Sequence, residues 1–276
     1  MKPVRFDYVV ARDGAEAVKL LRKHGDEAKC IAGGQSLGPM LNLRLARPGV
    51  LVDLHHAEDL GLTEQKSKCI IYGSTQRHAD FEDGFVPDAT NGMLQTVASR
   101  IGYRAIRNRG TLGGSISHGD PAADWIGVMI GLDATYLLRS LDGVREVPSA
   151  DFMSAAFMTE LGVDEILAGV SVPRLSGAAR WGYYRYSRKS TGFSEATGIV
   201  IADPERGYSR VVVGALDIPP VALEQVANAL AEEGVEQAIA CTREAVNEMF
   251  SGYSDDKRQL YTVVVCRALA QIGEQQ

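Results

Sequence analysis

The sequence predicts an α+β protein with two small α/β units, residues 1–57 and 58–176, and a third unit, residues 177–276, that combines an antiparallel sheet with helices. In the first two units, short apolar runs typical of strands alternate with segments whose apolar residues recur at helical spacing. In the third, strand-like segments follow one another before helix-like segments begin. The chain has 276 residues and 45% apolar content, enough for a large core divided into two domains or into subdomains.

The first unit opens with a predicted helix over residues 14–25, because Asp13 is suited to cap its N-terminus and Gly25 to end it. The apolar side of this helix consists of Ala17, Val18, Leu20 and Leu21. The other predicted elements are a buried strand over 28–32, a helix over 37–46 and a strand over 49–54.

The second unit contains two predicted helices among strands, and a hairpin turn at Leu141, Asp142 and Gly143. Its helical patterns lie in ATNGMLQTVASRIG and AADWIGVMIGLD, and its strands in KCIIYG, ATYLLRS, VREVP and DEILAGVSVP. The third unit has strands in RWGYYRYSRK, EATGIVIAD and YSRVVVGALDI, as in an antiparallel meander. Helices are predicted in VALEQVANALAEEG, VEQAIACTREAVNEMF and SDDKRQLYTVVVCRALAQIG.

The composition excludes several classes of protein. A net charge of -6 without long runs of Lys or Arg argues against a nucleic-acid surface. The apolar runs are too short for a signal peptide or a membrane span, so the sequence predicts a cytoplasmic protein. The four cysteines form no CxxC pair and the histidines no metal-ligand spacing, so we expect free thiols and neither a metal site nor a cysteine-ligated cluster.

Two glycine segments, AGGQS at 32–36 and TLGGS at 111–115, are the candidate ligand-binding features. Glycine lets the backbone approach a ligand closely, and successive free N–H groups form an anion-binding nest. Ser36 and Ser115 are suited to cap following helices or to donate to a phosphate oxygen. Two such nests would suit a pyrophosphate, whereas the alternative is that both segments are tight turns. Neither matches the G-x-G-x-x-G or GK[ST] patterns of ordinary nucleotide-binding loops.

The longer motifs around these segments resemble a known family. AGGQSLGPMLNLRLARPGVLVDL and IRNRGTLGGSISHGDPAADW are similar to the FAD-binding medium subunit of molybdenum hydroxylases, a family that includes the medium subunit of aerobic carbon monoxide dehydrogenase and the flavin domain of xanthine dehydrogenases. DEILAGVSVP, YYRYSRKSTGFSEA, VVVGALDIPP and YTVVVCRAL extend the resemblance over nearly the whole chain. It implies the PCMH-type FAD-binding fold.

The resemblance also implies a set of FAD-binding residues. The first segment is expected to wrap the FAD pyrophosphate with Ala32, Gly33, Gly34, Gln35, Ser36 and Leu37. The second segment contributes Thr111, Gly113, Gly114 and Ser115, and the matching acidic position is Asp124. Ile101 and Leu167 match apolar positions near the cofactor, and Tyr184 and Arg185 stand where the family often has a lysine near the flavin.

Each of these residues also has a purely structural interpretation. Asp124 would serve as a charge at a helix N-terminus, Ile101 and Leu167 as core residues, and the strand with Tyr184 and Arg185 as a surface strand. On that strand, side-chain alternation places Tyr184 and Arg185 on opposite faces. His118 has no triad partner in the sequence, so we interpret it as a loop residue that supports the cofactor.

The function implied by the resemblance is electron transfer by an FAD-binding subunit. Electrons from an iron-sulfur subunit and a molybdopterin subunit, in a heterotrimer or a dimer of heterotrimers, would pass through [2Fe–2S] clusters to FAD and on to NAD, a quinone or oxygen. The alternatives are a self-contained FAD oxidase or reductase of the same fold, and a scaffold that no longer binds flavin.

Overall fold

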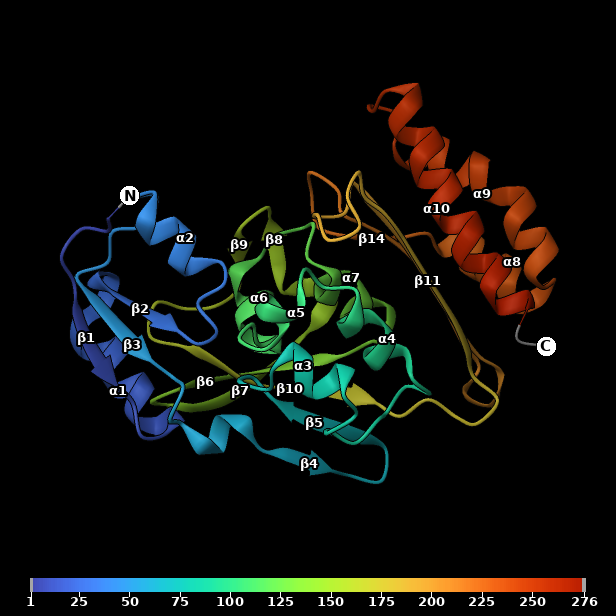
Figure 1. The fold of residues 1–276 in the computed structure, drawn as a ribbon. Helices are drawn as coiled ribbons and strands as arrows, with labels where there is room; N and C mark the ends of the chain where they lie inside the picture. The colour runs from blue at the N-terminus through green and yellow to red at the C-terminus, as the bar shows by residue number, and fades with distance from the viewer. Residues whose placement is uncertain (1, 275–276) are drawn as a thin grey trace.

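The structure, a computed structural model, describes residues 2–274 and contains three larger sheets, one in each predicted unit (Figure 1). The N-terminal unit lies at one end of the molecule, the central unit lies in the middle, and the C-terminal helices form the other end. Both helices and strands are abundant, so the predicted α+β class is confirmed. Among the described residues, none of the helices combines the length and the apolar character that crossing a membrane requires.

The N-terminal sheet is parallel, with strand order β1-β3-β2. Helix α1 begins where predicted, since the Asp13 carboxylate accepts a hydrogen bond from the Glu16 N–H at 2.7 Å, and it ends at Gly25, whose φ is 55°. Helix α2 is shorter than predicted, because Arg44 has a φ of 60° that no helix continues. The bounds are β1 Asp7–Val10, α1 Gly14–His24, β2 Ala28–Ile31, α2 Leu37–Asn42 and β3 Val50–Asp53.

The central sheet is antiparallel, with strand order β4-β5-β10-β6-β7, and short helices lie over it in Figure 1. The predicted hairpin at Leu141–Gly143 joins β6 to β7. Two further strands, β8 Met153–Ala155 and β9 Met158–Thr159, pair separately. The remaining bounds are β4 Thr63–Gln65, β5 Cys69–Gly73, α3 His78–Glu82, α4 Met93–Ser99, α5 Arg104–Arg107, α6 Leu112–His118, α7 Asp124–Gly131, β6 Thr135–Ser140, β7 Gly143–Pro148 and β10 Ile166–Pro173.

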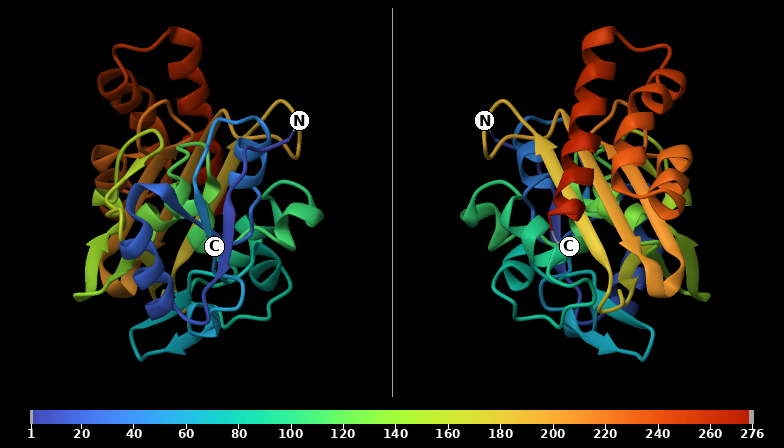
Figure 2. Two further views of the ribbon diagram at one scale, coloured as in Figure 1. Left: turned by 90° about the vertical axis from the view of Figure 1, so that its left-hand side faces the viewer. Right: turned by 90° about the vertical axis from the view of Figure 1, so that its right-hand side faces the viewer.

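The C-terminal sheet is an antiparallel meander, β11-β12-β13-β14, with helices α8 and α10 against one face and α9 packed on those two helices (Figure 2). Gly182 and Gly198 let α10 lie directly on this sheet, because a Cβ on either would come within 2.7 Å of the α10 backbone. The bounds are β11 Arg180–Tyr186, β12 Ala196–Asp203, β13 Tyr208–Gly214, β14 Val221–Ala222, α8 Glu224–Glu232, α9 Val235–Met249 and α10 Asp255–Gly273.

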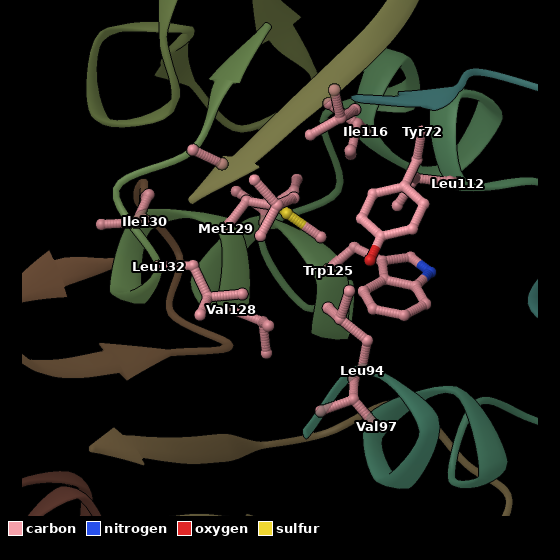
Figure 3. Close-up of a cluster of buried hydrophobic side chains, with 14 of the residues drawn as sticks. Tyr72, Leu94, Val97, Leu112, Ile116, Trp125, Val128, Met129, Ile130 and Leu132 are labelled. Atoms are coloured by element: carbon pink, nitrogen blue, oxygen red, sulfur yellow. The ribbon is translucent and has the colours of Figure 1, made fainter. Parts of the chain in front are cut away.

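The largest core cluster joins the central unit to the other face of the C-terminal sheet. Trp125 of α7 is fully buried at its centre, next to Tyr72 of β5 (Figure 3). Tyr183, Ile199 and Val212 of the C-terminal sheet belong to the same cluster. The two units therefore share one apolar interior, which fixes the position of β11 relative to α7.

Candidate functional site

The first glycine segment is in direct backbone contact with Arg109 and Gly110, the two residues that lead into the second glycine segment. A Cβ on Gly33 would lie 2.7 Å from the Cα of Gly110 and closer still to the carbonyl oxygen of Arg109. A Cβ atom does not come this close to backbone atoms of another segment in real proteins. Residue 33 therefore has to be glycine for the backbone to pack so closely here. The structure thus brings together segments that are far apart in the sequence, as predicted.

The first segment presents free donors. It connects the end of β2 at Ile31 to the start of α2 at Leu37, and Gly34 within it has a φ of 69°. Among residues 2–274, no group accepts a hydrogen bond from the backbone N–H groups of four consecutive residues, Gly33, Gly34, Gln35 and Ser36. Unpaired N–H groups in series form a nest that binds an anion such as a phosphate.

The second segment differs from the prediction, because it is the first turn of helix α6 and not a loop. Thr111 caps this helix by accepting a hydrogen bond from the Gly114 N–H at 3.1 Å, so neither Ser115 nor Ser36 has the capping role that the sequence suggested. Gly113 donates to the Ser74 carbonyl at 2.8 Å, and a Cβ on it would lie 2.8 Å from that oxygen. Most N–H groups here serve the fold, which leaves the first segment as the nest.

A platform, residues 74–78, holds the second segment in place. The Leu112 N–H donates to the Gln76 carbonyl at 2.9 Å, and the His78 N–H donates to the Gly110 carbonyl at 3.0 Å. Arg77 and Thr111 form a β-bridge between the platform and the second segment. The exposed part of the second segment is consequently Gly114, with Ser115 half-buried beside it.

A polar pocket lies where the two segments meet. Arg77 and Arg109 line it, no carboxylate does, and neither guanidinium forms an ion pair with any group in residues 2–274. Two unpaired guanidinium groups beside a backbone nest fit the two negative charges of a pyrophosphate. The full lining is Ala32, Gly33, His55, Thr75, Arg77, Arg109 and Thr111.

His55, Arg77 and Arg109 were missed in the sequence. His55 comes just after β3, where its N–H donates to the buried Asp53 carboxylate at 2.9 Å, and Asp53 also accepts from the Tyr8 hydroxyl at 2.6 Å. In the sequence, His55 follows the strand β3, Arg77 directly precedes helix α3, and Arg109 stands two residues before the second glycine segment.

Asp124 belongs to a buried cluster with Tyr183, Arg185 and Ser194. The Tyr183 hydroxyl donates to the Asp124 carboxylate, and the Arg185 Nε lies 3.7 Å from the same carboxylate. Both charged side chains are only 8% exposed. Burial raises the pKa of Asp124, and the positive charge of Arg185 opposes this shift. The cluster ties the C-terminal sheet to the start of α7.

Arg185 also reaches the end of α4. Its guanidinium donates to the carbonyl of Arg100, next to the half-buried Ile101, and to the Ser194 hydroxyl at 3.0 Å. Phe193, on the segment after β11, is 74% exposed. The structure therefore gathers three predicted residues, Asp124, Arg185 and Ile101, into one region that is separate from the glycine segments.

Tyr184 and Leu167 are not brought to this region. Tyr184 lies on the opposite face of β11, where it packs against the C-terminal helices and its hydroxyl bonds to Arg267. Leu167 is 4% exposed within the large core. His118 is the last residue of helix α6 and not the loop residue that the sequence predicted; it is half-buried beside the Phe157 ring at 5.2 Å, and burial lowers its pKa.

Comparisons with known proteins place these features in context. A family model described as the FAD binding domain in molybdopterin dehydrogenase matches residues 4–175. The chain is 36% identical over 218 residues to the alpha subunit of the 6-hydroxypseudooxynicotine dehydrogenase complex of Paenarthrobacter nicotinovorans, covering 78% of this chain and 74% of that one. It is 30% identical to the carbon monoxide dehydrogenase medium chain of Hydrogenophaga pseudoflava, covering 82% and 79%.

Solved structures are similar over the full length. Carbon monoxide dehydrogenase from Hydrogenophaga pseudoflava superimposes with a TM-score of 0.90 at 28% identity, covering 100% of this chain and 99% of that one. Quinoline 2-oxidoreductase from Pseudomonas putida 86 gives a TM-score of 0.90 at 27% identity, with the same coverage. The similarity in structure thus includes the C-terminal unit, which the family model does not reach.

Proposed function

Since this chain belongs to the family of FAD-binding domains of molybdopterin dehydrogenases, we propose that its two glycine segments hold the pyrophosphate of FAD. The observation that supports this most strongly is the run of four unpaired N–H groups, Gly33 to Ser36, held by backbone contact against Arg109 and Gly110 at the entry to the second segment. Arg77 and Arg109 add positive charge at the same place. The chain is an FAD-binding subunit of a molybdenum hydroxylase-type oxidoreductase, and its role is electron transfer.

The residues of this chain then bind and orient the cofactor. FAD, when bound, supplies the redox chemistry that accepts and passes on electrons. We assign the pyrophosphate to the nest, and the flavin end to the region of Ile101, Asp124 and Arg185, where a buried cation favours nearby negative charge. Leu167 supports this region through the core, and Tyr184 is dropped from the proposed FAD contacts because of its place on β11.

The partners and organisation are part of the same proposal. The names of the relatives describe a medium chain and complex subunits, which supports assembly with an iron-sulfur subunit and a molybdopterin subunit in a heterotrimer. The electron acceptor is NAD, a quinone or oxygen, and the complex is cytoplasmic. We also propose domain boundaries at 1–57, 58–176 and 177–276, since each range contains one of the three larger sheets.

A competition experiment on the purified chain tests the pyrophosphate assignment. FAD binding is followed by flavin fluorescence, with ADP as competitor and riboflavin as a ligand that lacks phosphate. We expect ADP to displace FAD and riboflavin to bind much more weakly. Equal affinity for riboflavin and FAD would mean that the glycine segments do not bind phosphate.

A further inference from the structure

His78 is a buried residue that connects the second glycine segment to α7. The residue is the last of the platform described above, and it is only 4% exposed. Its ring Nδ1 accepts a hydrogen bond from the Trp125 Nε1–H at 3.0 Å, and its backbone N–H donates to the Gly110 carbonyl at 3.0 Å. Trp125 directly follows Asp124, so His78 bridges the two regions proposed to hold FAD.

The imidazole ring also fills the space beside Gly110. A Cβ on Gly110 would lie 2.8 Å from His78 Nε2 and 2.9 Å from its Cδ2. Gly110 in turn is the residue whose Cα faces Gly33 across the contact between the two segments. The position of the His78 ring therefore sets where Gly110 lies, and Gly110 sets where the first segment packs.

We propose that His78 is a positioning residue that holds the second glycine segment at the separation from the first that FAD binding requires. This inference rests on the proposed FAD site but assigns a role to a residue outside the proposed contacts. Trp125 has an indole N–H that needs an acceptor in the core, and His78 Nδ1 is the acceptor that the structure provides. Loss of that acceptor leaves the indole N–H of Trp125 buried and unpaired, and it removes the hydrogen bond that fixes the side chain at position 78.

The surroundings of His78 keep its ring neutral. Burial, and then the positive charge of Arg107 on α5, lower the pKa of His78 to about 4. Arg107 is itself paired with Glu82 on α3, and Asp80 on the same helix bonds to the Arg77 N–H. A protonated ring has an N–H on both nitrogens and no longer accepts from Trp125. Acid therefore opposes the arrangement that His78 maintains.

Two substitutions at position 78 separate the acceptor from the bulk of the ring. His78→Asn keeps an acceptor oxygen near the position of Nδ1, whereas His78→Leu has similar size to Asn and no acceptor. We expect the FAD dissociation constant to rise about tenfold in His78→Leu and by less than about threefold in His78→Asn. In a Trp125→Phe background, which lacks the donor, His78→Leu should change the constant by less than about twofold.

A pH profile gives a readout that a merely structural role would not change. Wild-type FAD affinity should stay level down to about pH 5 and fall as the pH drops through about 4, where the His78 ring of the folded protein takes up a proton, and His78→Asn should lack that step because Asn does not titrate. Circular dichroism of each FAD-free variant establishes that it is folded during the measurement. Should His78→Leu fail to fold, FAD binding by His78→Asn and Trp125→Phe and the wild-type pH profile still test the positioning role of His78.

The outcomes distinguish the two proposals. If the wild type binds FAD, and His78→Leu binds it equally well with the same pH profile, the positioning role is refuted while the FAD site stands. If the wild type does not bind FAD at all, the proposed function fails, and the inference about His78 fails with it.

Discussion

Replacing Gly33 by alanine adds one methyl group at the contact between the two glycine segments. That methyl carbon would lie 2.7 Å from the Cα of Gly110, whereas nonbonded carbon atoms rest about 3.5–4.0 Å apart. The segments would have to separate by roughly 1 Å, because the atoms in the way are backbone and cannot rotate aside. Overpacking of this kind costs about 1–3 kcal/mol. When the full cost is taken from the free energy of FAD binding, the FAD dissociation constant rises between about fivefold and a hundredfold.

The assay is a fluorescence titration of FAD into the purified variant, with Gly252→Ala as the matched control. Gly252 lies between α9 and α10, with nothing within 4 Å of an added Cβ, so the same chemical change should leave FAD binding unchanged. Unaltered affinity in Gly33→Ala, in a folded protein, would refute the conclusion that close contact of the two segments forms the FAD site.

Further predictions concern the cap of α6, the buried ion pair, Tyr184 and the buried histidine. Thr111→Val removes the cap of α6 and should lower the free energy of unfolding by about 1 kcal/mol, seen as a fall of about 2 °C in Tm; an unchanged Tm would show that the cap is unimportant. Arg185→Met leaves the buried Asp124 carboxylate unpaired and should destabilise by about 3 kcal/mol at pH 8. The loss should be smaller at pH 5, because the pKa of Asp124 is raised and its protonated form carries no charge; equal losses in thermal melts would contradict this. Tyr184→Phe should retain FAD after desalting as well as wild type does, since Tyr184 faces the C-terminal helices. Neutral His78 contributes stability that is complete above pH 6.5 and is lost as the pH falls to 4, so urea denaturation should show a decline about 3 kcal/mol larger in wild type than in His78→Asn.

The parts of the fold that depend on local sequence could be predicted. Helix α1 follows from the Asp13 cap, its apolar spacing and Gly25, and the hairpin at Leu141–Gly143 from its turn residues. Helix α6 was not predicted, because its first turn contains Gly113 and Gly114, which are poor helix formers. It forms because the Thr111 cap and the platform bind that turn from outside the helix.

The candidate site could be predicted in part, again only where it depends on local sequence. The glycine segments were identified from their own residues, but the need for glycine at position 33 arises from a segment far along the chain. Alternation along β11 correctly separates Tyr184 from Arg185 but does not say which face meets the central unit. Gly182 indicates which face this is. It shares a face of β11 with Tyr184, and a glycine there permits the close approach of a helix, so that face meets the C-terminal helices and the face of Arg185 meets the central unit.

A crystal structure of the chain with FAD bound is the most direct test of the account. It should place the pyrophosphate oxygens about 2.7–3.2 Å from backbone nitrogens between Gly33 and Ser36, with the flavin towards Arg185. A pyrophosphate bound elsewhere, with those N–H groups facing only water, would contradict the assignment of the two glycine segments as the FAD site.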